Sequence, residues 1–258
     1  MGSTVRRPSS PSGGLNQHMN NRLYPGVLLE APAKLTLSLR VTGVRDDGFH
    51  LIDAEMVTLD LADHLAITPG ESGLEIVGSY AAGVNSDENN LVNRALQLCN
   101  QQASVRIDKN IPSGGGLGGG SADAAAILRW ASFTDLLAAS HLGADIPFCM
   151  VGGRARVGGI GEIVSPLPFV AHDITLIVPP LSISTPQVYR TWDSLGGPTA
   201  MGANDLEPAA IAVEPRLALW RDRIMEATGV TPTLAGSGST WWIFGAHTRL
   251  AGVLPGAT

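Results

Sequence analysis

The glycine-rich stretch between residues 111 and 126 constrains this chain more than any other feature. It reads Ile-Pro-Ser-Gly-Gly-Gly-Leu-Gly-Gly-Gly-Ser-Ala-Asp-Ala-Ala-Ala, so six of the seven residues 114–120 are glycine. A backbone without side chains can adopt positive φ and approach a ligand closely, at a cost in conformational entropy. The alanine-rich sequence that follows favours a helix, and the free N–H groups and dipole at a helix N-terminus favour phosphate. The pattern predicts a loop that binds nucleotide phosphates.

Other glycine-rich motifs fit this stretch less well. It contains the G-x-G-x-x-G spacing of dinucleotide folds at Gly114, Gly116 and Gly119. A dinucleotide turn follows its strand at once, whereas here residues 110–113 separate the strand-like segment 105–108 from the glycines. The lysine of a P-loop is missing, because glycine precedes the serine that ends the loop. A flexible linker would lack the helix that follows.

Two polar residues near the loop have alternative roles. Ser121 stands where the loop meets the predicted helix, so its hydroxyl could cap that helix or meet a metal ion held by the phosphates. Asp145 precedes Pro147, which is suited to the first turn of a helix. Asp145 is therefore either a helix N-cap or a carboxylate aimed at the phosphate loop.

Composition restricts the classes of partner. A chain of 258 residues with 44% hydrophobic residues can bury one large core or two small ones. Its net charge of −6 argues against nucleic acid and acidic membranes as partners. No apolar run approaches the roughly 20 residues of a membrane span. Cys99 and Cys149 have no metal-binding spacing, and we expect both to be reduced core residues of a cytoplasmic bacterial protein.

The first 26 residues are rich in Ser, Pro, Gly and Asn and contain no acidic residue. This composition predicts a disordered leader. Arg6-Arg7 is not followed by the apolar segment of a secretion signal.

Residues 27–41 alternate between apolar and polar side chains, which is typical of a half-buried strand. The alternation places Lys34 and Thr36 side by side on the polar face. Lys34 and Lys109 are the lysines of a chain otherwise biased toward arginine, which suggests that a compact positive charge is needed at each. Phe49 and His50 follow a turn at Asp46-Asp47-Gly48. Such a pair could bind a planar ligand, although a structural role is favoured when it is taken alone.

The rest of the chain alternates between strand and helix patterns. We expect strands at 56–61, 65–67, 74–77, 105–108, 174–178 and 241–244, and helices at 89–102, 120–130, 134–142 and within 206–227. The pattern changes after Glu162, and a second small-residue loop, Gly236-Ser237-Gly238-Ser239-Thr240, precedes the last strand. We therefore expect a two-lobed α+β protein with its ligand cleft between the lobes.

In this order the motifs resemble a known family. Residues 112–121 look like the phosphate loop of the galactokinase, homoserine kinase, mevalonate kinase and phosphomevalonate kinase (GHMP) superfamily. Ala31-Pro32-Ala33-Lys34-Leu35-Thr36-Leu37, Asp47-Gly48-Phe49-His50, Leu142-Gly143-Ala144-Asp145-Ile146-Pro147-Phe148 and Gly236-Ser237-Gly238 narrow the resemblance to the 4-diphosphocytidyl-2-C-methyl-D-erythritol kinases of the non-mevalonate isoprenoid pathway. It extends from about residue 29 to residue 244.

The resemblance implies a site for ATP and Mg²⁺. It implies that Asp145 accepts the proton of the substrate hydroxyl and that Lys34 stabilises the developing negative charge. It assigns the ATP phosphates to Pro112, Ser113, Gly114, Gly115, Gly116, Leu117, Gly118, Gly119, Gly120, Ser121 and Ala122, and the wall of the nucleotide pocket to Asn90 and Lys109. Ser121 is the residue expected to meet Mg²⁺ bound to ATP.

The resemblance also implies a pocket for a cytidyl diphosphate sugar alcohol. Phe49 and Tyr189 would stack on both faces of the cytosine ring, and His50 would form hydrogen bonds to its edge. Thr185 and Arg190 would lie near the same pocket. Thr36 departs from the asparagine that is common at this position.

The same resemblance implies the fold and domain order. After the leader (1–26), we expect an N-terminal lobe like ribosomal protein S5 (27–165) and a ferredoxin-like C-terminal lobe (166–258). The chain ends 14 residues after Phe244, so we expect the second lobe to be abbreviated. The expected protein is a monomer or homodimer. Two alternatives stay open, which are a GHMP kinase for mevalonate or homoserine and a non-catalytic ligand sensor on the same fold.

Overall fold

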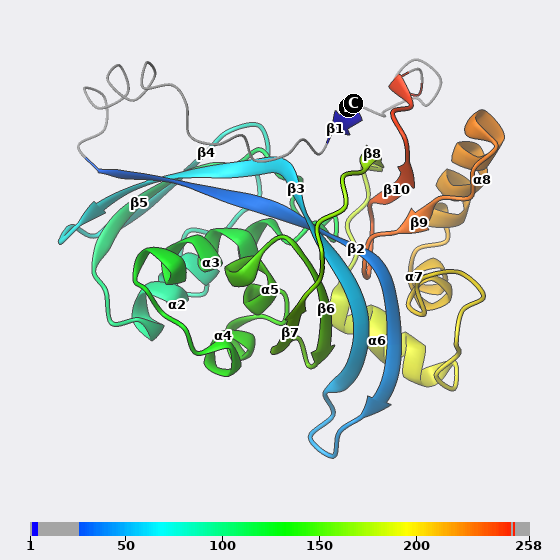
Figure 1. Cartoon of the computed structure of the whole chain (residues 1–258), viewed down its shortest axis with the longest axis horizontal. Coiled ribbons are helices and arrows are strands. Elements are labelled where there is room, and N and C mark those ends of the chain that lie inside the picture. The colour runs from blue at the N-terminus through cyan, green and yellow to red at the C-terminus, as the bar shows by residue number, and fades with distance from the viewer. Residues whose placement is uncertain (1, 5–25, 249, 251–258) are drawn as a thin grey trace.

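The computed structural model describes residues 2–4, 26–248 and 250. A long antiparallel pair of strands, β2 (Val27–Val44) and β3 (His50–Pro69), runs through the molecule and bends at its middle (Figure 1). Lys34 and Thr36, predicted to share the polar face of β2, are both buried. The glycine-rich loop covers that face, and the amide N–H of Lys34 donates to the carbonyl of Leu117 at 3.0 Å.

Four further strands complete the first sheet. Its order is β4-β5-β3-β6-β7, with β2 paired to β3. The added strands are β4 (Gly73–Val77), β5 (Ala103–Asp108), β6 (Arg154–Gly159) and β7 (Ile163–Pro166). The helices of this lobe are α2 (Leu91–Leu98), α3 (Gly119–Trp130), α4 (Leu136–Leu142) and α5 (Ile146–Val151). In Figure 1 these helices lie together on one side of the sheet.

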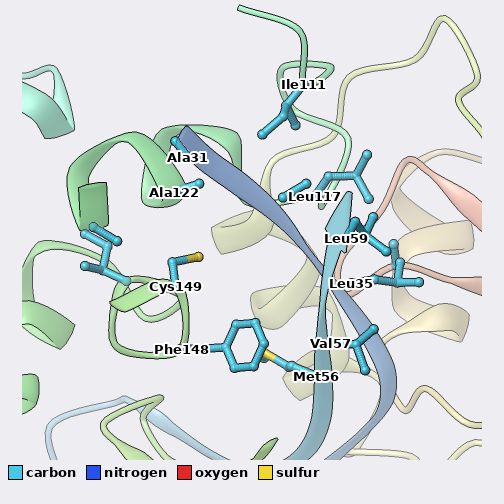
Figure 2. Packing of buried hydrophobic residues seen from close by; sticks show 14 of the residues in the cluster. Ala31, Leu35, Met56, Val57, Leu59, Ile111, Leu117, Ala122, Phe148 and Cys149 are labelled. Atoms are coloured by element: carbon cyan, nitrogen blue, oxygen red, sulfur yellow. The ribbon is translucent and has the colours of Figure 1, made fainter. Parts of the chain in front are cut away.

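Helix α3 is the central helix of the first core. Its alanine run is buried, and the small side chains allow β2, α2 and α5 to pack closely around it. Figure 2 shows Ala122 of α3 next to Ala31 of β2, and Phe148 of α5 next to Met56 of β3. Leu117 is the one apolar residue among the loop glycines and is fully buried. It anchors the loop in the core and leaves the glycine backbone outside.

Among the described residues, the second lobe contains a four-stranded sheet and three helices. The strand order is β1-β8-β10-β9. The strands are β1 (Gly2–Thr4), β8 (Asp173–Ile177), β9 (Thr233–Leu234) and β10 (Trp241–Phe244). The helices are α6 (Thr185–Ser194), α7 (Glu207–Val213) and α8 (Arg216–Thr228). The predicted two-lobed α+β fold is confirmed (Figure 1).

Several element boundaries differ from the expectation. The two runs 56–61 and 65–67 form one strand, β3, because the alternation continues between them. The helix expected within 206–227 is divided at Pro215, which starts α8 because proline cannot donate the hydrogen bond that a helix interior needs. Pro32 lies inside β2, beside a register shift in its pairing with β3.

Most of the predicted leader and the last eight residues, 251–258, lie outside the described residues. Within the leader segment, Gly2–Thr4 pair with β8. No helix in the described part of the chain has the length and hydrophobicity to cross a membrane.

Candidate active site

The predicted catalytic pair is an ion pair in the structure. Lys34 Nζ, on β2, lies 3.1 Å from Asp145 Oδ2 and donates to Thr36 Oγ1 at 3.3 Å. Asp145 precedes α5 but makes no capping hydrogen bond to it. Asp145 thus occupies the N-cap position of α5, while its carboxylate pairs with Lys34 and the residue lines the cavity beside the loop. The Lys34 residue is only 4% exposed, so its ammonium is held in place rather than free in solvent.

The glycine-rich loop adopts the backbone conformations that its composition predicts. Gly114, Gly116 and Gly118 have φ of +71°, +78° and +71°. Gly118 is the N-cap of α3 and has no side chain to offer. The suggestion that Ser121 caps this helix is therefore wrong, because the helix already begins at Gly119. A β-carbon at Gly118 would lie 2.8 Å from Lys34 Cγ, so a glycine at this position allows the close approach of Lys34.

The second small-residue loop, residues 235–240, packs directly on the first. The amide N–H of Thr240 donates to the carbonyl of Gly115 at 3.1 Å. A β-carbon on Gly115 would lie 2.8 Å from Thr240 Oγ1, and one on Gly116 would lie 2.2 Å from the carbonyl oxygen of Ala235. The two loops therefore touch through their backbones, and this contact joins the lobes at the site.

A third segment fixes the second loop. The buried side chain of Asn204 donates to the carbonyls of Leu234 and Gly236 at 2.9 and 2.6 Å. Its neighbour Asp205 accepts from Arg40 Nη1 at 2.7 Å and from the amide of Val41 at 3.1 Å. Asn204 thus forms hydrogen bonds to the second loop, and Asp205 forms hydrogen bonds to strand β2 of the first lobe.

The loop lines a cavity of about 470 Å³. Its wall includes Asn90, Lys109, Asp145, Thr185 and the backbone of residues 112–116 and 118–120. The structure thus brings these predicted nucleotide and catalytic residues together. Of the predicted phosphate-loop residues, Leu117 and Ala122 belong to the core, and Ser121 is half-buried in the first turn of α3. These three do not line the cavity.

Lys109 is engaged by two carboxylates beneath the loop. Its ammonium pairs with Asp63 Oδ2 and, at 2.6 Å, with Asp123 Oδ2. Although burial lowers the pKa of Lys109, the two carboxylates raise it further than burial lowers it. Burial also raises the pKa of Asp123 to about 7, against the opposing effect of Lys109. Asp123 Oδ1 is buried and has no hydrogen-bond partner within the described protein.

Asn90 caps α2 and forms part of the cavity wall. Its Oδ1 accepts from the amide of Val92 at 2.9 Å, and its Nδ2 donates to the carbonyl of Asn85 at 2.5 Å. Thr185, the first residue of α6, forms a 2.7 Å hydrogen bond with Ser237 of the second loop. Both residues reach the cavity from segments that their own hydrogen bonds hold in place.

Of the predicted substrate residues, the structure brings together His50, at the start of β3, and Tyr189, on α6. The rings of His50 and Tyr189 lie 4.6 Å apart, and His50 Nε2 lies 2.8 Å from Asp193 Oδ1. Burial, and to a smaller extent the negative charge of Asp145, raise the pKa of Tyr189. Phe49 is 54% exposed near the turn, and Arg190 is exposed on α6. This set adjoins the loop-lined cavity through Asp145.

Sequence reasoning missed several residues of the site. Asp63, Asp123, Asp193 and Asn204 received no role. A signal was present for Asp123, because an acidic residue inside a buried alanine run needs a charged partner. The contact of Asn204 with the second loop gave no such signal, since its side-chain NH₂ donates to carbonyls 30 and 32 residues away.

A second cavity, of about 480 Å³, lies over β2, β3, β4 and β5 and is lined in part by Leu28, His64 and Arg106. None of the predicted site residues lines it. Within the described ranges, no three His, Cys, Asp or Glu side chains gather closely enough to hold a metal ion.

Comparison with known proteins gives a consistent result. The family model for the GHMP kinases N terminal domain matches residues 90–153. The 4-diphosphocytidyl-2-C-methyl-D-erythritol kinase of Paracoccus denitrificans (strain Pd 1222) is 37% identical over 253 residues, which cover 88% of this chain and 92% of that protein. The kinase of the same name from Ruegeria pomeroyi is 37% identical over 238 residues, covering 81% of this chain and 85% of that protein.

Solved structures extend the comparison to the fold. A crystal structure of 4-(cytidine 5'-diphospho)-2C-methyl-D-erythritol kinase matches with a TM-score of 0.68 and 32% identity, covering 86% of this chain and 90% of that chain. The mevalonate kinase of Methanococcus jannaschii shares the fold, with a TM-score of 0.51 at 12% identity over 89% of this chain and 94% of that chain.

Proposed function

The chain belongs to the 4-diphosphocytidyl-2-C-methyl-D-erythritol kinase family, and from that premise we propose that it transfers the γ-phosphoryl group of ATP to the 2-hydroxyl of 4-diphosphocytidyl-2-C-methyl-D-erythritol. One observation carries the proposal. The Lys34–Asp145 ion pair, at 3.1 Å, lies at a cavity lined by a glycine backbone. Phosphoryl transfer needs positioned phosphates, compensation of negative charge and a group that orients the hydroxyl.

Asp145 is the proposed base. Its side chain is 31% exposed, and it lines the cavity beside the phosphate loop. The substrate oxygen attacks the γ-phosphorus, its proton passes to the Asp145 carboxylate, and the bond from the γ-phosphorus to ADP breaks. A positioned base contributes about 10²–10⁴-fold to the rate.

Lys34 is the proposed electrostatic partner. Its ammonium bonds Asp145 and Thr36, and its aliphatic stem packs on Gly118 of the loop. This arrangement would hold the Lys34 ammonium between Asp145 and the phosphates. Because the side chain is already fixed, it need not be ordered during the reaction. Thr36 thus positions Lys34, which is a role distinct from the substrate contact expected of it.

Backbone amides and Mg²⁺ complete the proposed nucleotide site. The loop brings free N–H groups and the N-terminus of α3 to one wall of the cavity. Mg²⁺ prefers oxygen ligands and is usually held by one or two protein groups together with substrate phosphates. The Ser121 hydroxyl, on the first turn of α3, is the protein oxygen that would hold the ion, although Ser121 does not line the cavity itself.

The aromatic cluster is the proposed cytidyl pocket. Tyr189 and Phe49 would stack on the cytosine, and His50, which Asp193 holds, would read its edge. Base stacking on an aromatic ring contributes roughly 1–3 kcal/mol in single-stranded nucleic-acid complexes. Thr185, the first residue of α6, and Arg190, further along that helix, would contact the remainder of the acceptor.

An ATP-coupled assay tests the substrate. The acceptors are 4-diphosphocytidyl-2-C-methyl-D-erythritol, free 2-C-methyl-D-erythritol 4-phosphate, mevalonate and homoserine, all at the same concentration. We expect turnover with the cytidyl compound and at least tenfold lower kcat/KM with the others. Comparable activity on any of the other three would refute the substrate assignment and retain the kinase. No turnover with any acceptor, despite ATP binding, would favour the ligand sensor. The oligomeric state, a monomer or homodimer, and the cytoplasmic location of the protein stay predictions.

A further inference from the structure

Three charged side chains beneath the phosphate loop form a buried cluster that the proposed reaction does not use. Asp63 is 0%, Lys109 2% and Asp123 3% exposed. They come from three elements, since Asp63 is on β3, Lys109 follows β5 and Asp123 is on α3. A buried charge is costly unless it is paired and hydrogen-bonded. A cluster with two carboxylates and one ammonium in this place therefore requires a reason.

The cluster holds the entrance of the loop. Asp63 Oδ1 accepts hydrogen bonds from the amides of Asn110 and Ile111, at 2.5 and 2.8 Å, while its Oδ2 pairs with Lys109. These two amides immediately precede Pro112, the first residue of the loop. Asp63 thus fixes the backbone from which the glycines start.

The same ammonium holds the exit of the loop. Asp123 follows the last loop glycine by three residues and lies in the first turns of α3. Its Oδ2 is 2.6 Å from Lys109 Nζ. A β-carbon on Gly119 would lie 3.3 Å from the same nitrogen, so the ammonium sits directly under the turn that begins α3. One nitrogen therefore connects both ends of the glycine run.

Lys109 and Asp123 form part of the wall of the loop-lined cavity, but they are only 2% and 3% exposed, and the geometry of the ammonium does not suit a direct phosphate contact. The ammonium is enclosed by two carboxylates, and the three side chains carry one net negative charge when all are ionised. Such a group would not attract phosphates to the cavity. It would, however, limit the freedom of a glycine backbone, whose ordering otherwise costs more conformational entropy than that of any other residue. A loop that is ordered before the ligand arrives binds more tightly.

We propose that Lys109, with Asp63 and Asp123, is a positioning residue that fixes the two ends of the phosphate loop and does not itself contact the nucleotide. The inference rests on the proposed role of the loop in binding ATP. It changes the role expected of Lys109 from a ligand of the nucleotide to a support of the backbone that binds it.

Calorimetric titration with ADP, without acceptor, tests the inference. Lys109→Met keeps the length of the side chain and removes its charge. We expect it to weaken ADP binding at least tenfold, because both carboxylates lose their shared partner. In Lys109→Met/Asp123→Asn the new amide can donate to Asp63 and reconnect α3 to β3, so we expect at least a threefold recovery of affinity. If Lys109 contacted phosphate directly, the second substitution would restore nothing.

Two further variants keep the test decisive if Lys109→Met does not fold. Asp123→Asn alone retains an acceptor for Lys109, so we expect ADP affinity to change less than threefold. Under direct contact, this change would free the ammonium and tighten ADP binding, a result that would overturn the proposal. Asp53→Asn is the matched control, since Asp53 lies on the same strand in an exposed pair with Arg156, and we expect unchanged affinity.

The kinetic readout separates positioning from general instability. For the folded variants, KM for ATP should rise in parallel with the Kd for ADP, while KM for the acceptor changes less than threefold. A loss of kcat with unchanged KM for ATP would contradict the proposed role of Lys109 in positioning the loop. Failure of the wild-type protein to bind ADP would instead refute the proposed function.

Discussion

Two glycines of the phosphate loop provide a matched pair of substitutions. Gly114 and Gly116 have nearly the same φ, +71° and +78°. At Gly114 the nearest atom to an added β-carbon is Ser182 Oγ, at 3.4 Å. At Gly116 the β-carbon would lie 2.2 Å from the carbonyl oxygen of Ala235 and 2.9 Å from that of Gly238. Alanine therefore causes the same backbone strain at both positions but a steric clash at one.

The expected magnitudes follow from these contacts. The left-handed backbone costs an alanine about 1–2 kcal/mol at either position. At Gly116 the second loop must also retreat, because 3.4 Å is the start of ordinary contact and the β-carbon would lie at 2.2 Å, a difference of 1.2 Å. Overpacking of this kind costs roughly 1–3 kcal/mol. Gly116→Ala should therefore lower the free energy of unfolding by about 2 kcal/mol more than Gly114→Ala.

Urea unfolding of both variants without nucleotide measures this difference. Activity supplies a second readout, because a displacement of about 1 Å in a catalytic arrangement can cost ~10²-fold in rate. We expect such a loss in kcat/KM for Gly116→Ala, while the wild-type protein and Gly114→Ala serve as references for stability. Equal stability of the two variants would refute the reasoning, because it would show that the loops do not press on each other in solution.

Three other predictions test the site. Asp145→Asn should keep ADP binding but lower kcat by about 10²–10⁴-fold, and near wild-type turnover would remove Asp145 from the mechanism. Tyr189→Ala should lower kcat/KM for the cytidyl acceptor roughly tenfold or more with little change in KM for ATP, whereas an unchanged kcat/KM would show that the cytosine ring does not stack on Tyr189. Burial raises the pKa of the Cys149 thiol to about 12, so this thiol stays protonated at pH 8.5 and should resist iodoacetamide until urea unfolds the protein; rapid labelling of the folded protein, mapped by mass spectrometry, would contradict its burial.

The sequence was most informative where function restricts residue type. A run of glycines predicted both the loop and the helix after it, because few other roles justify so much backbone freedom. Lys34 and Thr36 were placed on one face by strand periodicity, and the structure joins them by a hydrogen bond. Periodicity did not predict that the glycine-rich loop would cover this face, because it describes the strand and not the segments that pack on it.

Residues that act through distant partners were not predictable in this way. The contact of Asp63 with Lys109 spans 46 residues, and nothing in the local pattern of β3 distinguishes Asp63 from a surface carboxylate. Ser121 was misplaced as a helix cap because the first turn of α3 uses glycines, which local propensity disfavours in a helix. Tertiary contacts decided both cases.

The hydrogen bonds of residues 204–205 to β2 and to the second loop have a consequence for recombination between kinases of this fold. Much of this junction is backbone hydrogen bonding, which is indifferent to side chains, as between Thr240 and Gly115 or between Leu39 and Ala203. Its sequence-dependent parts are few, namely the amide of Asn204, the pair of Arg40 with Asp205 and the missing β-carbons of the phosphate loop. A chimera that exchanges whole lobes should therefore keep the two loops packed on each other, provided that these few residues are retained together.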